Sequence, residues 1–480
     1  MGAGYCLIRE LKPYSLAEVA NNFGCKQEQA YEVLKQLLAH GVVRYRTGTE
    51  QDDSEIADGA EASGEQRYQF RYVGIVIVKR FVIVCYPKYI RRESGPTEEE
   101  LCQMVRVLRR LDRLDDLATP QEDGKRDNVL STMVRLLELY DEYGVYSNFE
   151  RTHKLNGDGV IDWERTVNTV LPVISSEQPI YIDYWTRKTE RDESDLVTRL
   201  HRAILTECSR FLTRCGIAGL LELGNIELTS VAPVDLGDVA ALDWNLERER
   251  ATQFVTWKQE AIDLMRLYLG NGGVAAGADQ VLCMGTTAYY HSWELACKVA
   301  FGDLLDKELE DLPLELVGKW RGRSHEKLLQ IIPHPIWEQA DGNDFGNTDT
   351  LIPDTVTFVQ DKGSPVFCIY DAKYYVPYIS ANGKLTRQPG LESVTKQFLY
   401  QSAYKDFIEQ HNFHAVINAF LVPTDDDKAS KIARVTFSEV MGKVNHPFSN
   451  HIDMWSLPAI KVFDAYLRAV RVDLLSMDMI

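Results

Sequence analysis

Long apolar runs, paired metal-ligand cysteines and an excess of positive charge are all missing from this sequence of 480 residues. The most apolar stretch, residues 72–90, is interrupted by Lys79 and Arg80, so it predicts two strands around a turn rather than a membrane helix. The nine cysteines are scattered without the CxxC or Cys/His spacing of a zinc site. These absences predict a cytoplasmic protein without a membrane segment, a signal peptide or structural zinc.

A phosphate-binding loop is missing as well. The glycine-rich stretch at residues 270–273 lacks the Lys-Ser/Thr pair that such a loop needs, and it is predicted to be a linker. The chain is therefore not expected to hydrolyse a nucleotide itself.

The net charge of −18 is distributed unevenly. Residues 47–66 carry seven acids and no base, whereas residues 67–92 carry seven bases and no acid. The acidic run predicts a solvated loop, and the overall balance predicts weak non-specific binding of the isolated chain to DNA. An enzyme of this composition that acts on DNA is expected to be brought there by another protein.

What the sequence does contain is the pattern of a β-hairpin. Residues 354–359 and 366–373 are rich in strand-forming side chains, and the residues between them form a turn that contains Gly and Pro. If the strands pair symmetrically about this turn, Asp354 faces Asp371. The two-residue period of a strand then puts Lys373 on the same face as Asp371.

Two facing carboxylates repel each other unless a cation or a proton lies between them. Mg²⁺ prefers carboxylate oxygens, and Mn²⁺ is a possible substitute. Beside such an ion, Lys373 could orient or help deprotonate an attacking water while the metal offsets charge on a phosphate. The pattern therefore predicts a metal-dependent nuclease.

A non-catalytic interpretation stays open, because Pro-Asp followed later by Asp-x-Lys is a loose pattern. The same charged groups could form only a buried ion network. The setting favours catalysis, since residues 366–370 are apolar enough for a central strand, where ionised groups are rarely placed without a function.

Predicted helices lie on both sides of the hairpin in sequence. Residues 290–305 form an apolar stripe with Glu294 beside it, which is either a third acid of the site or part of an ordinary surface ion pair. Residues 392–408 place Gln397 and Gln401 one turn apart. Their amides either hold a phosphate or a water, or belong to a solvated face.

These motifs together resemble the PD-(D/E)xK nuclease superfamily. The matching residues are Pro353-Asp354, Asp371-Ala372-Lys373, the earlier Glu294 and the later Lys396-Gln397. More closely, the chain is similar to LlaJI-type restriction endonucleases, which are relatives of the McrC nuclease subunits. This similarity extends over most of the chain from residue 68 onward and includes residues 72–77, 86–89, 179–183 and 200–201.

The resemblance implies hydrolysis of phosphodiesters in double-stranded DNA. It gives metal binding to Asp354, Asp371, the Ala372 carbonyl and, as an auxiliary ligand, Glu294; water positioning to Lys373; and a supporting role to Gln397. It also implies a separate partner, an AAA+ GTPase like McrB, that reads and translocates DNA and licenses cleavage.

The pattern along the chain predicts a mixed α/β fold in three parts. Residues 1–92 are expected to form a winged-helix-like unit with a basic hairpin, whose first helix begins with a capping box at Ser15 and Glu18. Residues 93–275 are expected to form a mostly helical middle domain, with helices at 101–117, 128–143, 196–215 and 252–269 and a short β-like piece at 179–183. Residues 280–480 are expected to form the nuclease domain, a mixed β-sheet flanked by helices, with further strands at 415–422 and 432–437 and a closing helix at 457–475. The winged-helix unit either binds DNA or docks a partner, because acids lie on its second helix.

A basic segment around Trp320 precedes the hairpin. Its bases, Lys319, Arg321, Arg323 and Lys327, are expected either to contact DNA phosphates together with Gln401 or to be ordinary exposed charges.

The leading hypothesis is therefore the DNA-cleaving subunit of a restriction system that defends against phage. One alternative is a self-sufficient, site-specific type II endonuclease whose winged helix selects the site. Another is a non-catalytic winged-helix adaptor that binds DNA. Homo-oligomer formation stays open in each case.

Overall fold

The computed structural model describes residues 4–46, 67–118, 129–175, 177–274, 280–338, 344–346, 349–361, 363–380, 382–437 and 447–472. The predicted acidic loop, residues 47–66, lies outside this part of the chain. Within the described residues the fold is mixed α/β, as predicted, and no helix there combines the length and the apolar character needed to cross a membrane.

Contacts divide the chain into two compact units. Unit 1 comprises Met1–Tyr5, Val78–Arg80 and Asp123–Cys283, and unit 2 comprises Cys6–Ile77, Phe81–Glu122 and Met284–Ile480. These units follow different boundaries from the predicted parts at residues 1–92, 93–275 and 280–480. The predicted division into functional domains stays a prediction.

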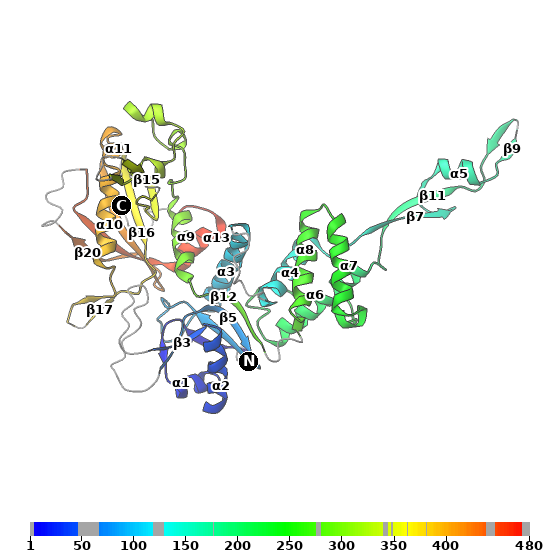
Figure 1. The fold of residues 1–480 in the computed structure, drawn as a ribbon, viewed down its shortest axis with the longest axis horizontal. Coiled ribbons are helices and arrows are strands. Elements are labelled where there is room, and N and C mark those ends of the chain that lie inside the picture. Colours follow the sequence, from blue (N-terminus) through cyan, green and yellow to red (C-terminus); the bar gives the residue numbers. More distant parts are fainter. Residues whose placement is uncertain are drawn as a thin grey trace. The chain divides into compact units, whose positions relative to one another are not determined.

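A five-stranded mixed sheet lies in unit 2, with the strand order β15-β16-β19-β21-β20 (Figure 1). Its strands and flanking helices are β15 (Thr355–Asp361), β16 (Ser364–Ala372), β19 (Ala415–Thr424), β20 (Ser430–Thr436), β21 (His451–Pro458), α9 (Tyr289–Phe301), α10 (Leu391–Ala403), α11 (Lys405–Gln410) and α13 (Ala459–Arg468). β16 and β21 run parallel to β19, whereas β15 and β20 are antiparallel to their neighbours.

Strands were predicted at residues 415–422 and 432–437, and both are confirmed as β19 and β20. β21 was not predicted, because a helix was expected to begin at residue 457. The chain first completes this strand, and α13 begins at Ala459.

Helices cover both faces of the sheet: α10 and α11 lie on one face, and α9 and α13 on the other (Figure 1). Phe398 of α10 packs in one apolar cluster with Phe420 of β19. On the opposite face, Phe301 of α9 contacts Tyr370 of β16 with ring centroids 5.2 Å apart. Each such buried aromatic side chain contributes about 1.5–3 kcal/mol, so packing rather than helix propensity holds these layers together.

The predicted hairpin is confirmed, including its register. Val359 of β15 pairs with Val366 of β16, and the pairing continues to Thr355 opposite Tyr370. Gly363 in the turn has a φ of +84°, a conformation that other residues rarely adopt. The turn therefore fixes which residues of the two strands face each other.

The N-terminal part of unit 2 contains the two helices and the strands predicted there, together with two short strands, β1 and β2, that were not predicted. These are β1 (Cys6–Arg9), β2 (Pro13–Tyr14), α1 (Leu16–Asn22), α2 (Gln27–Ala39), β3 (Val43–Arg46), β4 (Arg67–Phe70), β5 (Val73–Val78) and β6 (Phe81–Tyr86). Ser15 and Glu18 form the predicted capping box at the start of α1, which satisfies main-chain donors that the helix itself leaves unpaired. β2, β4 and β3 form a small antiparallel sheet.

A second sheet has the order β1-β6-β5-β12, where β12 spans Val281–Thr286. Gly74 and Gly285 approach each other closely there. A Cβ on Gly74 would lie 2.2 Å from the Met284 carbonyl oxygen, and a Cβ on Gly285 would lie 2.2 Å from the Val73 carbonyl oxygen. The φ angles of the two glycines are +141° and +150°, so both positions require glycine for space and for conformation.

Helix α3 (Glu98–Ala118) was predicted to open the helical middle domain, but it packs on α13 within unit 2. Gln103 donates a hydrogen bond to the Ile460 carbonyl oxygen at 2.7 Å, and Arg110 donates to the Leu467 carbonyl oxygen at 3.0 Å. Helical periodicity alone gave no sign of this, because an apolar stripe does not indicate which partner covers it.

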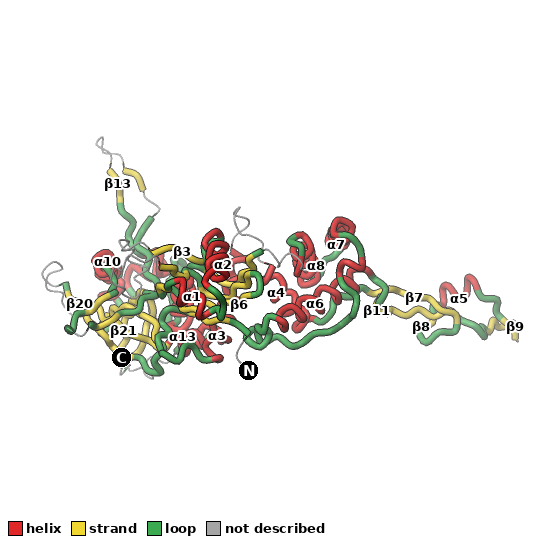
Figure 2. Tube along the Cα trace, turned by 90° about the horizontal axis from the view of Figure 1, so that it is seen from below, coloured by secondary structure: helices red, strands yellow, loops and turns green. Residues whose placement is uncertain are grey.

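Unit 1 contains a helical bundle and a long arm (Figures 1 and 2). The bundle consists of α4 (Val129–Tyr143), α6 (Leu196–Arg214), α7 (Val239–Thr252) and α8 (Thr256–Gly270), with the short 3₁₀ helix η1 (Pro233–Leu236). Buried His201 of α6 accepts a hydrogen bond from the Tyr146 N–H at 2.9 Å, and burial lowers its pKa to about 3. This ring is therefore a neutral structural acceptor.

The arm was predicted only as a short β-like piece at residues 179–183. Its elements are β7 (Phe149–Leu155), β8 (Val160–Ile161), α5 (Trp163–Thr169), β9 (Val173–Ser175), β10 (Gln178–Ile180) and β11 (Trp185–Arg191). β7 and β11 pair along their whole length and run away from the bundle (Figure 2). Its large apolar side chains that are at least half exposed are Phe149, Leu155, Val160, Trp163, Val167, Leu171, Val173, Ile174, Ile180 and Ile182.

The remaining short elements of unit 2 include two small two-stranded sheets, β13-β14 and β17-β18, and the β13 hairpin projects from the body of the unit (Figure 2). They are η3 (Leu309–Asp311), η4 (Gly318–Arg323), η5 (Leu328–Ile331), β13 (Ile336–Glu338), β14 (Asp344–Gly346), β17 (Tyr378–Ile379) and β18 (Leu385–Thr386).

Candidate active site

Asp354 and Asp371 meet at one end of the hairpin. The confirmed register places Asp354, which precedes β15, opposite Asp371 near the end of β16. Asp354 Oδ2 accepts a hydrogen bond from the Ala372 N–H at 2.9 Å. Asp371 lies on the face covered by α10, since Ile369, two residues earlier in β16, points into the same apolar cluster as that helix.

The Asp371 carboxylate changes the pKa of its neighbour Asp354. Asp371 is 5% exposed, and Asp354 is partly buried. Burial, together with repulsion from Asp371, raises the pKa of Asp354 to about 7 from its ordinary value of 3.8. Lys373 and the Ala372 N–H oppose this rise without cancelling it. At neutral pH the Asp354 carboxyl therefore keeps a proton in part.

Lys373 completes the cluster. Its Nζ lies 2.8 Å from Asp371 Oδ1, and its side chain is 24% exposed. Burial lowers the pKa of this ammonium, but the Asp371 carboxylate outweighs burial and leaves the pKa above its ordinary value. The lysine is therefore charged, and its partial exposure lets it face a ligand.

Helix α9 and the main chain of Lys373 are hydrogen-bonded to the same carbonyl group of β19. The Leu421 carbonyl oxygen of β19 accepts hydrogen bonds from the Lys373 N–H at 2.9 Å and from Trp293 Nε1 at 3.0 Å. Glu294 follows Trp293 in α9, and its Oε1 pairs with Lys298 at 3.0 Å. Asp354 and Glu294 both raise the pKa of Cys297, after burial, so this turn of α9 lies next to the carboxylate pair.

Gln397 lies in α10 over the sheet and is fully buried. Neither Nε2 nor Oε1 of its amide has a hydrogen-bond partner among the described residues. The main chain of Gln397 is fixed by Asn418 of β19, whose Nδ2 donates to the Gln397 carbonyl oxygen at 3.0 Å. Unsatisfied buried amides are costly, so the amide of Gln397 has both a donor and an acceptor available for a further polar partner.

Gln401, for which the sequence left a phosphate contact and a solvated face open, is buried and hydrogen-bonded within the chain. Its Nε2 donates to the Ser449 carbonyl oxygen at 3.0 Å, and its Oε1 accepts from the Ser449 N–H at 2.9 Å. The side chain is only 4% exposed. Gln401 therefore ties α10 to the chain before β21, and its amide is already used.

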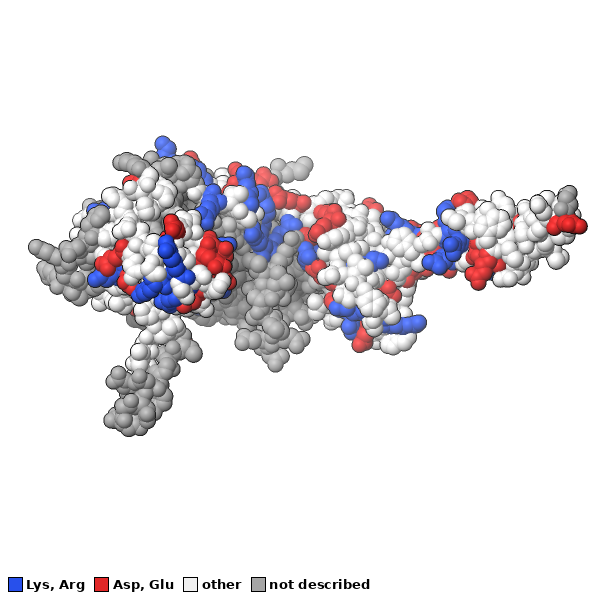
Figure 3. All heavy atoms as spheres, turned by 90° about the horizontal axis from the view of Figure 1, so that it is seen from above, with Lys and Arg blue, Asp and Glu red and all other residues white. Residues whose placement is uncertain are grey.

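The predicted basic segment at residues 319–327 lies around the buried Trp320. Each of its bases is paired with an acid: Lys319 with Asp406, Arg321 with Glu315 at 3.1 Å, Arg323 with Glu326 at 2.7 Å, and Lys327 with Asp306 at 3.1 Å. On the face drawn in Figure 3, basic and acidic side chains are likewise interspersed. This pairing is what the alternative of ordinary exposed charges predicted.

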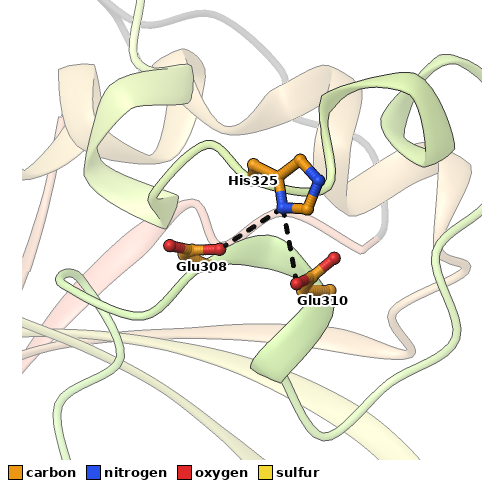
Figure 4. A group of neighbouring side chains, drawn as sticks. All are labelled: Glu308, Glu310 and His325. Carbon is orange, nitrogen blue, oxygen red and sulfur yellow. Dashed lines mark ion pairs between the residues drawn. The ribbon is translucent and has the colours of Figure 1, made fainter.

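Another group of metal-ligating side chains lies near this segment (Figure 4). His325 Nδ1 is 3.6 Å from Glu308 Oε2 and 3.4 Å from Glu310 Oε1. The His325 side chain is 83% exposed. The three side chains lie close together at the surface, where acidic groups commonly cluster without a metal ion.

Asn418, Leu421 and Tyr374 were not singled out from the sequence, although all of them contact the cluster or its supports. Asn418 stands opposite Ile369 in a parallel pair of strands that are far apart in the chain. The one local signal was an amide within the otherwise apolar run of β19, a position where an unpaired polar group is costly.

The chain is similar to known proteins over most of its length. The LlaJI restriction endonuclease family model matches residues 72–314 and 322–462 of the chain. The chain is also similar to the type II restriction enzyme BsuMI component YdjA of Bacillus subtilis (strain 168), with 24% identity over 412 residues, which are 83% of this chain and 80% of that protein.

Solved structures of assemblies from Thermococcus gammatolerans also match the chain, with low TM-scores. One is a half-complex from the tetradecameric assembly of Thermococcus gammatolerans McrB AAA+ hexamers with bound McrC, with a TM-score of 0.38 and 13% identity over 97% of this chain and 99% of that chain. Another is the cryo-EM structure of the Thermococcus gammatolerans McrBC complex, with a TM-score of 0.26 and 14% identity over 55% of this chain and 79% of that chain.

Proposed function

The chain belongs to the LlaJI restriction endonuclease family, and from this premise we propose that it is the Mg²⁺-dependent, DNA-cleaving subunit of a cytoplasmic restriction system that defends against phage. The observation that carries this proposal is the charged cluster in which Asp354 faces Asp371 and Lys373 lies 2.8 Å from Asp371. Its members are the Pro-Asp and Asp-x-Lys residues of the PD-(D/E)xK pattern.

The carboxylate pair fits a hard divalent cation. Repulsion between the two groups contributes to the raised pKa of Asp354, and a cation between them would relieve it. Mg²⁺ takes carboxylate and carbonyl oxygens, which Asp354, Asp371 and the Ala372 carbonyl would supply, and Mn²⁺ can replace it. When bound, the ion supplies Lewis acidity that offsets charge on the scissile phosphate.

Lys373 supplies the group that handles the attacking water. Its ammonium is held by Asp371 and is partly exposed, so it can donate a hydrogen bond to a water placed over the carboxylate pair. A fixed cation there orients the water and stabilises the negative charge that develops as the proton leaves.

Glu294 and Gln397 are proposed as supporting groups from the two faces of the sheet. Glu294 lies next to the pair on α9 and can serve as an auxiliary ligand once it leaves Lys298. Gln397 offers a buried amide without a partner among the described residues, which suits a water or a phosphate oxygen.

For contacts with the DNA backbone we propose the bases of residues 319–327 in a reduced role. Lys319, Arg321, Arg323 and Lys327 would have to exchange an acid for a phosphate, so each contributes little net affinity. Weak intrinsic binding agrees with the net charge of −18 and implies that another protein delivers this subunit to DNA.

That protein is proposed to be an AAA+ GTPase like McrB, as the McrC resemblance implies. The chain itself has no phosphate-binding loop. The arm of unit 1 supports a protein partner, because its exposed apolar side chains include Leu171 at 93% and Ile174 at 67% exposure. Exposed apolar patches of this kind mark interaction surfaces.

The proposal is tested with purified components and supercoiled plasmid DNA. The chain alone is expected to be nearly inert, and addition of the GTPase encoded next to it, with GTP and Mg²⁺, is expected to produce cuts. Omitting GTP or adding EDTA is expected to abolish cleavage, since both the partner and the metal are required.

Other outcomes favour other functions. Robust GTP-independent cleavage by the chain alone would overturn the partner and support a self-sufficient type II endonuclease. A folded chain that binds DNA but never cuts it, with any partner or metal, would overturn the enzyme and support the winged-helix adaptor.

A further inference from the structure

A buried hydrogen bond joins the residue after Lys373 to the N-terminal part of unit 2. The Tyr374 hydroxyl donates to Glu10 Oε2 at 2.6 Å. Tyr374 is 5% exposed and Glu10 is 6% exposed, so water does not compete for this bond. Glu10 immediately follows β1, and the two residues are far apart in the sequence.

The Glu10 carboxylate is held in place by the sheet that contains β1. The Glu10 N–H donates to the Tyr86 carbonyl oxygen at 2.9 Å, which continues the parallel pairing of β1 with β6. Oε2 also accepts the Lys88 N–H at 3.0 Å. The acceptor that Tyr374 uses is therefore a fixed point of the N-terminal sheet rather than a mobile surface group.

The ring of Tyr374 is enclosed by aromatic and cationic neighbours. Its centroid lies 6.2 Å from that of Tyr89 and 5.7 Å from that of Tyr289, the first residue of α9, in edge-on arrangements. Lys88 Nζ lies 4.6 Å from the ring centroid. The hydroxyl can move away from Glu10 only if this packing changes.

The main chain of Lys373 is hydrogen-bonded to the five-stranded sheet and continues directly into Tyr374. The Lys373 N–H donates to the Leu421 carbonyl oxygen at 2.9 Å, and the Lys373 carbonyl oxygen accepts the Tyr375 N–H at 2.8 Å. Because Tyr374 is the next residue in the chain, its anchored ring limits how far the main chain that carries the Lys373 side chain can turn.

Packing alone does not explain the choice of residues. A buried carboxylate is expensive, and an apolar pair would fill the same space at lower cost. We propose that Glu10 and Tyr374 are positioning residues, through which the N-terminal sheet holds the Lys373 ammonium on Asp371; this inference rests on the proposed function of Lys373. The N-terminal part of unit 2 thereby becomes part of the active-site support.

The test measures where Lys373 is held, without relying on cleavage. The metal-free chain is labelled with an amine-reactive reagent at fixed pH, and the rate at Lys373 is followed by peptide mass spectrometry. Tyr374→Phe keeps the ring and removes the hydroxyl, so labelling of Lys373 is expected to accelerate several-fold. Glu10→Gln keeps an acceptor for the hydroxyl and is expected to label at nearly the wild-type rate.

Tyr404→Phe is the matched control, because it removes another buried hydroxyl of unit 2, which donates to the Leu328 carbonyl oxygen at 3.2 Å. The labelling rate at Lys373 is expected to stay unchanged in this variant. In the partner-activated cleavage assay, Tyr374→Phe is expected to lower turnover several-fold with little change in the DNA concentration at half-maximal rate.

An unchanged Lys373 labelling rate in Tyr374→Phe, or an equal acceleration in Tyr404→Phe, would overturn the positioning role. Failure of the wild-type chain to cleave DNA while Tyr374→Phe still accelerates labelling would instead overturn the nuclease and leave the contact between the sheet and Lys373 standing.

Discussion

At the residue scale, we propose that the protonation of Asp354 controls whether the proposed metal binds. Burial, followed by the charge of Asp371, raises its pKa to about 7, so the metal-free site keeps a proton below that pH. Binding of a cation requires its loss. We expect Mn²⁺ affinity, measured by calorimetry, to rise by about tenfold per pH unit up to about pH 7 and then to level off.

The same shift fixes the sign of the effect on stability. Between its ordinary value of 3.8 and about 7, the folded protein holds a proton on Asp354 that the unfolded chain has lost. Stability of the metal-free protein from this group is therefore present at low pH and is lost as pH rises through that window. Mn²⁺ affinity that does not change between pH 6 and pH 8 would contradict this account of the pair.

Much of the charged cluster could be predicted from local sequence, and the reason is geometric. A symmetric turn and a two-residue period are enough to place Asp354 opposite Asp371 and to put Lys373 beside them. The contacts made by Asn418 and Glu10 could not be predicted. They come from pairings between strands distant in the chain, which leave no pattern near either residue.

At the scale of elements, the close approach of Gly74 and Gly285 makes a sharp prediction. Gly74→Ala would put a Cβ 2.2 Å from the Met284 carbonyl oxygen at a φ of +141°. The free energy of unfolding of unit 2 is expected to fall by about 3 kcal/mol or more, because main-chain atoms must move. Chemical denaturation followed by circular dichroism measures it.

Gly322→Ala serves as the control for that experiment, since a Cβ there meets no atom within 4 Å. It is expected to change stability by less than about 0.5 kcal/mol. If Gly74→Ala were as stable as Gly322→Ala, the close approach of Gly74 in β5 to Gly285 in β12 would be wrong.

The arm makes a different kind of prediction, about binding rather than folding. Leu171→Asp combined with Ile174→Asp changes exposed side chains, so the melting temperature is expected to stay within a few degrees of wild type. Binding to the GTPase partner is expected to weaken by about tenfold or more, because apolar anchors at an interface carry much of its affinity. Analytical ultracentrifugation of the mixed proteins measures this.

Phe254→Asp is the comparison for the arm, since Phe254 is 89% exposed in the same unit but lies between α7 and α8. It is expected to bind the partner like wild type. Equal binding by the arm variant and this control would show that the arm is not the docking surface.

Elements with strong apolar periodicity were predictable, and the arm was not. The helices expected at residues 101–117, 128–143 and 196–215 correspond to α3, α4 and α6. The strands of the arm expose side chains on both faces and lack the alternation of apolar and polar residues that marks a half-buried strand. β21 was missed because its last residues resemble the start of the helix that follows.

At the scale of the whole molecule, the chemistry and the composition point to a division of labour. The chain carries the charged cluster of a nuclease but a net charge of −18 and no nucleotide-binding loop. Under the proposed function, recognition and energy are assigned to a partner and cleavage to this chain. The chain belongs to a restriction endonuclease family, and the hairpin carries the residues whose role can be tested.

The most direct test compares the variants Asp371→Asn and Asp361→Asn. Asp361 lies at the turn end of the same hairpin, away from Asp371. Both variants are assayed for plasmid cleavage with the GTPase partner, GTP and Mg²⁺. The cleavage rate of Asp371→Asn is expected to fall at least about 100-fold, because this variant loses a proposed metal ligand and the carboxylate that holds Lys373. Asp361→Asn is expected to keep the wild-type rate. Wild-type cleavage by a folded Asp371→Asn chain would contradict the proposed active site.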